Sequence, residues 1–416
     1  MAEFYDPMLY MSTPDRPNTM GVVVELKEKV DGNVLRDVVE SLRARFPYFY
    51  VKAVPQGEDL LPEENPLPMT VRNTWAPIKL GSQESNFHLA AWKFEGQRLC
   101  FEIAHTLTDG AGLLPYIKSA VFLYLSNKLR LSFDRTGFRL PGDNIPESET
   151  GNPFAGLDID GAKKPSSVKE PTIDFYRLGE GADSDPRIAY IRLPEAQFME
   201  HCKNNAASPN AFLSVMFARA VRHYDPASEE TVSVSVSVDH KAMLGNYDNY
   251  RMASGSVELG FPKDMPLDDL KEACTVARKQ LTEQAQPENS LWAMRQMKAL
   301  CDKMNQVPLE MKLDLVSEDA GRSRWSVSIS YPRMRTFGPL DPYIESLYML
   351  SEPTVADVIR EVTCVNNSFF LAIAQSFASD AFLDVFLDEL SSTGIDYEVV
   401  RKEPFRLCGM EPVKLV

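Results

Sequence analysis

Closely spaced cysteines are missing from this chain of 416 residues. Its six cysteines form no CxxC pair and do not cluster with histidines, which argues against a structural zinc site and a disulfide framework. We therefore expect free thiols, mostly buried, and no metal centre. The six are Cys100, Cys202, Cys274, Cys301, Cys364 and Cys408.

Long apolar runs and an excess of basic residues are also missing. No segment has the apolar length needed to cross a membrane, and the first ten residues lack the basic region and apolar run of a signal peptide, so we expect a cytoplasmic protein. The net charge is −15 and the pI is near 5.0. An acidic surface repels nucleic-acid phosphates, although a local basic pocket could still bind one small anion.

Patterning and length predict an α/β protein in two halves, 1–140 and 187–416, joined by a crossover at 141–186 that is rich in Pro, Gly, Asp and Ser. Asn33 is the expected N-cap of the first helix, and Gly96 the expected turn residue of the clearest hairpin. Strands are predicted at 19–28, 48–54, 87–94, 98–105, 187–194, 231–238, 325–332, 359–365 and 368–375. Helices are predicted at 34–45, 112–127, 195–204, 209–223, 267–286, 291–315 and 380–390.

A hairpin followed by a helix occurs twice along the chain, once in each half. The first junction reads AHTLTD (104–109) and the second AQSFAS (374–379). If the two junctions correspond, only the first carries a histidine and an aspartate. This pattern indicates a duplicated architecture in which one half kept the chemistry.

The histidine at the first junction is the best candidate for chemistry. Of the five histidines only His105 has an aspartate four residues later, Asp109, and Gly110 follows to give the loop room. A neutral imidazole can take the proton from a hydroxyl or amine that attacks a thioester. Asp109 could hold the ring, or turn away and fix the loop through a basic partner. It could also simply cap the next helix beside a structural histidine.

The segment HTLTDG, after an apolar strand and before a helix, resembles the HxxxDG signature of the chloramphenicol acetyltransferase-like superfamily, which includes condensation domains. The chain is most similar to the bacterial alcohol acetyltransferase branch, and the DFGWG element of the plant branch is absent. The resemblance implies two related domains, with mixed sheets flanked by helices and an active-site tunnel between them. It also implies that His105 is the general base, and that Asp109 pairs with an arginine from the other half.

Several positions depart from that family pattern. The expected arginine is replaced by Lys241 in VDHK (238–241), with Arg251 as a second candidate partner for Asp109. Ser330 lies where the family has an SNLG element, and could either donate to an oxyanion or only bond within its own sheet. Four arginines could hold the phosphates of CoA, or could form a solvated charged edge. These are Arg322, Arg324, Arg333 and Arg335.

The sequence therefore predicts an acyltransferase that moves an acetyl or other short acyl group from acyl-CoA, a co-substrate rather than a permanently bound cofactor, to a small alcohol or amine. One alternative is a condensation-type enzyme that takes the acyl group from a carrier protein. Others are a non-catalytic module that binds ligands without turnover, and a subunit that scaffolds a complex. We expect a monomer, because the resemblance implies a site made within one chain.

Overall fold

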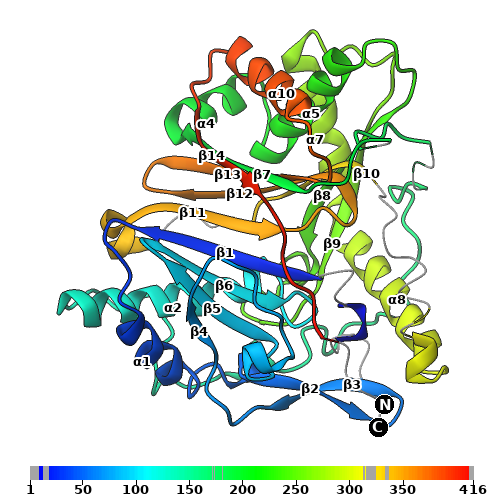
Figure 1. The fold of residues 1–416 in the computed structure, drawn as a ribbon. Coiled ribbons are helices and arrows are strands. Elements are labelled where there is room, and N and C mark those ends of the chain that lie inside the picture. Colours follow the sequence, from blue (N-terminus) through cyan, green and yellow to red (C-terminus); the bar gives the residue numbers. More distant parts are fainter. Residues whose placement is uncertain are drawn as a thin grey trace.

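The computed structural model describes residues 9–12, 18–170, 172, 174–179, 181–312, 314, 325–332 and 337–411. Two sheets lie side by side, and helices cover the face of each that points away from the other (Figure 1). The predicted class, an α/β fold with mixed sheets flanked by helices, is confirmed. Within the described residues, no helix has the length and apolar character that spanning a bilayer requires.

The first sheet has the strand order β11-β1-β6-β5-β4, with α1 and α2 beside it (Figure 1). Its strands are β1 Thr19–Leu26, β4 Val71–Asn73, β5 Ala90–Glu95, β6 Arg98–Ala104 and β11 Ile344–Ser351. A separate ribbon is formed by β2 Val51–Gln56 and β3 Asp59–Glu64. The helices of this half are η1 Leu9–Met11, α1 Gly32–Leu42, η2 Pro47–Phe49, η3 Gln83–Ser85 and α2 Gly110–Leu129.

The second sheet has the order β14-β7-β13-β12-β10-β8-β9, and β10 runs parallel to both β8 and β12. Its strands are β7 Arg187–Pro194, β8 Val232–Asp239, β9 Ser254–Phe261, β10 Trp325–Ser330, β12 Ala356–Val365, β13 Ser368–Gln375 and β14 Glu398–Pro404. The helices of this half are α4 Glu195–Asn204, α5 Pro209–Tyr224, α6 His240–Met243, α7 Leu270–Gln284, α8 Pro287–Met304, η4 Gly338–Tyr343 and α10 Ala381–Ser392.

Strand β11 joins the two halves. It comes from the second half of the chain, yet it pairs antiparallel with β1 and forms the edge of the first sheet (Figure 1). It also contacts β12 of the second sheet. The sequence did not predict β11, because its apolar residues run almost continuously and show no period of two. Strands β3, β4, β9 and β14 were not predicted either.

Several predicted boundaries are wrong by a few residues, for example the strand predicted at 48–54, which is β2 Val51–Gln56, and two errors have clear local reasons. Helix α1 is capped by Asp31 rather than Asn33, since the Asp31 carboxylate accepts the backbone N–H groups of Asn33 (2.9 Å) and Val34 (3.3 Å). The helix predicted at 291–315 is interrupted: α8 ends at Met304, and residues 309–312 are helical again after Pro308, which can begin a helix but cannot continue one. The turn at Gly96 was predicted correctly, with a positive φ of 59°.

The second hairpin also agrees with its prediction. Asn366 and Asn367 connect β12 to β13 and have φ of 50° and 56°, the left-handed values that a two-residue hairpin turn requires. The crossover contains one short helix, α3 Glu147–Thr150, and its other described residues are irregular. All six cysteines are outside disulfides, and five of them are buried.

Candidate active site

The His105 loop connects β6 to α2. The backbone N–H of His105 donates to the carbonyl of Asn18 (2.8 Å), the residue just before β1, which ties the start of the loop to that strand. The imidazole Nδ1 lies 3.0 Å from the carbonyl oxygen of Thr108. A carbonyl oxygen only accepts, so Nδ1 carries the proton and the neutral ring has its lone pair on Nε2. The ring is therefore oriented by the main chain of its own loop.

Asp109 turns away from that ring. Its carboxylate accepts the backbone N–H of Gly112 (2.9 Å), so it is the N-cap of α2, and it accepts the backbone N–H of Ala253 (3.1 Å). It also forms an ion pair with Lys241, with Nζ and Oδ2 2.6 Å apart. Of the three roles left open for Asp109, the geometry combines the helix cap with the loop fixed by a basic partner.

Lys241 is buried, with a relative exposure of 1%. Asp239 places it by accepting the N–H groups at the start of α6, including that of Lys241 (2.9 Å). The Lys241 ammonium also donates to the carbonyl of Arg251. The guanidinium of Arg251 donates to the Thr150 carbonyl (3.3 Å). Of the two candidate partners of Asp109, Lys241 supplies the positive charge. Arg251 contributes only its main-chain carbonyl, which accepts a hydrogen bond from Lys241.

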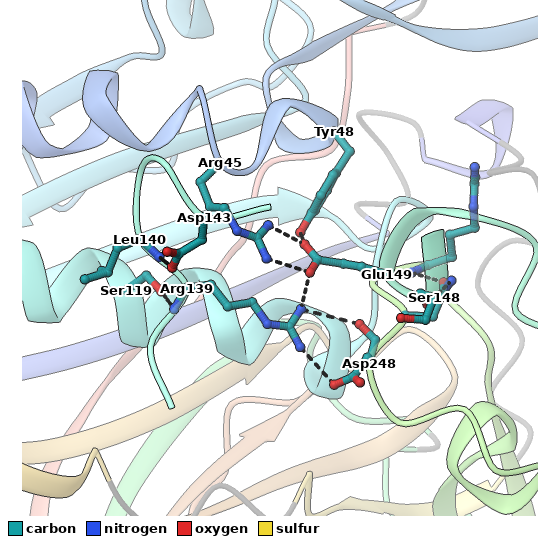
Figure 2. Close-up of polar contacts among 11 residues, drawn as sticks. Arg45, Tyr48, Ser119, Arg139, Leu140, Asp143, Ser148, Glu149 and Asp248 are labelled. Carbon is teal, nitrogen blue, oxygen red and sulfur yellow. Dashed lines mark hydrogen bonds and ion pairs between the residues drawn. The ribbon is translucent and has the colours of Figure 1, made fainter. Parts of the chain in front are cut away.

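Figure 2 shows the polar cluster around Glu149, in which Arg139 of the first half also contacts Asp248 of the second half. Glu149, from the crossover, is fully buried, and both of its oxygens accept from Arg45 (2.7 Å each). Arg139 contacts the same carboxylate (2.8 Å), and the Tyr48 hydroxyl donates to it. Burial opposes ionisation of Glu149, but the hydrogen bonds from Arg45 and Tyr48 outweigh it and lower the pKa of this carboxyl.

This cluster is coupled to the His105 loop through Tyr250. The backbone N–H of Tyr250 donates to the Glu149 carbonyl (3.1 Å), and the Tyr250 ring stacks on Tyr48 at 4.0 Å between centroids. The Tyr250 carbonyl accepts the hydroxyl of Thr108 (2.6 Å). The crossover thus positions residues 249–253, which in turn contact Thr108 and Asp109.

The close approach of Tyr250 restricts Gly112 more than Gly110. A Cβ at Gly112 would collide with the Tyr250 carbonyl oxygen, whereas a Cβ at Gly110 would meet only the end of Met349 at 3.0 Å and Pro332 at 3.1 Å. We expect Gly112→Ala to destabilise the protein by about 1–3 kcal/mol, and Gly110→Ala by less, because the Met349 side chain can move. Urea denaturation of both variants tests this; equal losses would contradict it.

A cavity of about 380 Å³ lies beside His105, with walls from both sheets. Asp109, Gly110 and Ser330 line it together with His105, so these four predicted residues share one space. Ser330 is the last residue of β10. Arg322, Arg324, Arg333 and Arg335, predicted to bind CoA phosphates, lie outside the described residues.

Several lining residues were not singled out from the sequence. The alternation in β8 and β10 places valine and isoleucine in the core under α5 and serine toward the cavity. The signal was present in SVSVSV, but period two alone does not tell which face meets a cavity. The serines that line it are Ser235, Ser237, Ser254, Ser256, Ser328, Ser330 and Ser351, and two glutamates join them, Glu352 and Glu361.

Glu352 should make stability depend on pH. Burial raises its pKa from the ordinary 4.5 to about 7, so the folded chain holds this proton more tightly than the unfolded chain. Stability contributed by the protonated form is present below pH 4.5 and is lost as the pH rises to about 7. We expect Glu352→Gln to match the wild type near pH 4.5 and to be more stable at pH 8 by about 1–3 kcal/mol. Urea denaturation at both pH values tests this, and an equal difference at both would contradict it.

Among the described residues, no group of three or more His, Cys, Asp or Glu side chains could hold a metal ion. Protein-family models give no match to the sequence, and neither do curated proteins. Solved structures do match over most of the chain.

Polyketide synthase associated protein 5 from Mycobacterium tuberculosis has a TM-score of 0.58 and 12% identity, and the match covers 90% of this chain and 93% of that one. TRI101 of F. sporotrichioides, solved with coenzyme A and T-2, also has a TM-score of 0.58 and 12% identity, with 94% and 98% covered. The epimerization domain of tyrocidine synthetase B has a TM-score of 0.53 and 11% identity, with 92% and 93% covered. At these identities the likeness shows the fold alone, and the chain therefore has the two-sheet fold of these solved proteins.

Proposed function

We propose that this chain is an acyltransferase that moves an acetyl or other short acyl group from CoA to a small alcohol or amine, with His105 as the general base. The observation that carries the proposal is the orientation of the ring. Nδ1–H is held by the Thr108 carbonyl, which leaves the Nε2 lone pair free to accept a proton, and the ring lines a cavity. A structurally similar protein, TRI101, was solved with coenzyme A, which supports a CoA thioester as donor.

The reaction proceeds by direct transfer. Nε2 of His105 takes the proton of the acceptor as its oxygen or nitrogen attacks the thioester carbonyl. The tetrahedral intermediate collapses, the C–S bond breaks, and the imidazolium returns the proton to the departing thiolate. Ser330 lines the same cavity and is the candidate donor to the oxyanion. Asp109 and Lys241 act through the loop and do not touch the substrate.

A carrier-protein thioester is the second candidate donor. Condensation domains of polyketide synthases match this chain as well, for example that of MokA with a TM-score of 0.51 and 12% identity. The same base and the same cavity would serve either donor, because both present an acyl group on a pantetheine thiol.

The test follows the release of free thiol from acetyl-CoA by the purified protein, with and without a panel of alcohols and amines, and with His105→Ala beside it. Release that the acceptor stimulates and the variant lacks supports the proposal. Equal release from both proteins would exclude His105 as the base. If CoA thioesters are not consumed, an acyl group loaded on a carrier protein is offered next. Ligand binding without turnover on either donor would favour a non-catalytic module.

A further inference from the structure

The cavity wall beside His105 is acidic. Among the lining residues that the structure describes, four are Asp or Glu and none is Lys or Arg. Asp109 is paired with Lys241, and Asp239 accepts the N–H groups that begin α6. The two glutamates, Glu352 and Glu361, each keep one buried oxygen, Oε2, to which no described group donates.

Glu361 is the more deeply buried of the two, with a relative exposure of 6%. Its Oε1 accepts the hydroxyl of Ser351 (2.7 Å), but no described group donates to its buried Oε2. The neighbouring Arg360 lies on the opposite face of β12, where its guanidinium lies 4.6 Å from the ring centroid of Phe217. Glu361 therefore lines the cavity and carries a buried carboxylate oxygen that no described group satisfies.

Glu352 repeats this arrangement on the adjoining wall. Its Oε2 is buried, and no described group donates to it. Burial has the largest effect on the Glu352 carboxyl and raises its pKa to about 7. The charge of Arg406 and a hydrogen bond from the backbone N–H of Leu407 act in the opposite direction but do not outweigh burial. Two buried acceptor atoms without donors are costly, and a ligand that brings donors relieves that cost.

Hydroxyl groups continue the polar wall from Glu361 across the sheet. The pairing of β12 with β10 sets Glu361 beside Ser330. Strand β10 pairs with β8 up to Ile329 and Val236, and Ser330 and Ser237 are the next residues in the same register. The pairing of β8 with β9 sets Ser237 opposite Ser256. All four residues line the cavity, so one row across four neighbouring strands offers a carboxylate and then hydroxyls. Such a row complements a ligand that carries both a cation and several hydroxyls.

Resting on the proposed acyl transfer, we propose that the acceptor is an amino alcohol. Its ammonium group binds to Glu361 and Glu352, its hydroxyls face the serine row, and one of its hydroxyls is acylated at His105. The ammonium has no lone pair and keeps its protons. The new bond is an ester formed by the hydroxyl oxygen, whose proton passes through Nε2 to the CoA thiolate as the C–S bond breaks. The polyanionic end of CoA would be repelled by these two carboxylates, which assigns this wall to the acceptor.

The experiment compares matched acceptors that differ by one group: serinol against glycerol, and glucosamine against glucose. Acetyl-CoA is the donor, thiol release gives kcat/KM, and hydroxylamine cleavage identifies an ester product. We expect the amine of each pair to be preferred by about tenfold or more, and Glu361→Gln to lower that preference about tenfold through KM. Glu345→Gln is the matched control: its side chain is 53% exposed, it does not line the cavity, and it should keep the preference.

Acetylation that favours the neutral alcohols and needs His105 would overturn the amino-alcohol inference while acyl transfer stands. An amide product would overturn it as well, because the amine would then be the nucleophile. If neither class is acetylated, calorimetry without CoA decides: tighter binding of the amines that Glu361→Gln removes supports the acidic wall, and equal binding overturns it. Thermal denaturation checks that Glu361→Gln folds, and Glu352→Gln takes its place if it does not.

Discussion

Replacing Lys241 with methionine should lower the free energy of unfolding by about 3–5 kcal/mol, because it leaves the Asp109 carboxylate buried without its cation. The side chains of both partners are buried, with relative exposures of 1% and 4%, and Nζ and Oδ2 are 2.6 Å apart. Two backbone N–H groups, from Gly112 and Ala253, would remain on Asp109. They cannot neutralise a buried charge. Urea denaturation at neutral pH measures the loss.

The double variant Asp109→Asn with Lys241→Met is the informative control. It removes both charges, and asparagine keeps an oxygen for the N–H of Gly112, so it should be more stable than Lys241→Met alone. Lys279→Met, at a side chain 73% exposed in a surface pair with Glu283, should change stability by less than about 1 kcal/mol. A loss in Lys241→Met no larger than in Lys279→Met would show that the buried pair does not hold the loop.

Replacing His105 with alanine should lower kcat for acyl transfer by about 10²–10⁴-fold, the usual contribution of a general base. The ring is only half-buried, and its side chain contacts the carbonyl oxygen of Thr108 in its own loop, so the fold should survive the change. Steady-state thiol release gives kcat and KM, and thermal denaturation reports stability. We expect kcat to fall while the denaturation midpoint changes little.

His201→Ala serves as a histidine control, because His201 lies on α4 and does not line the cavity. It should retain the wild-type rate. A large drop in stability in His105→Ala would mean that the residue is structural, which is the role that its motif alone left open. Unchanged kcat together with unchanged stability would remove His105 from the mechanism.

The strand–loop–helix unit around His105 was predictable because its signals are local. Bulky apolar residues alternate along 98–105, as in a strand, and become continuous after Gly110, as in a buried helix. Asp109 lies between the two patterns, and aspartate is a common N-cap. The same reasoning failed at α1, where Asp31 and Asn33 are both good caps and pattern alone did not separate them. The first residue of a helix depends on where the preceding loop turns into it, and the tertiary structure sets that position.

The partner of Asp109 was expected only through family resemblance. Lys241 lies 132 residues away in sequence and reaches Asp109 because β8 leads into α6 beside the His105 loop. The role of Glu361 was not foreseen at all. In sequence it is one charged residue in an apolar strand, and only the alternation of β12 across two packed sheets shows that it faces a cavity while Arg360 faces the core.

Local patterns thus sufficed for the α/β class, for most helices and strands, and for the histidine and aspartate at one junction, since helix and strand periods and caps depend on neighbours within a few residues. The placement of β11 in the first sheet, the ion pair of Asp109 with Lys241, the clamp of the crossover through Glu149 and the carboxylate-and-serine wall were decided by the tertiary structure. Each depends on the register and packing of segments far apart in the chain, and such long-range pairing leaves no periodic signal in the sequence.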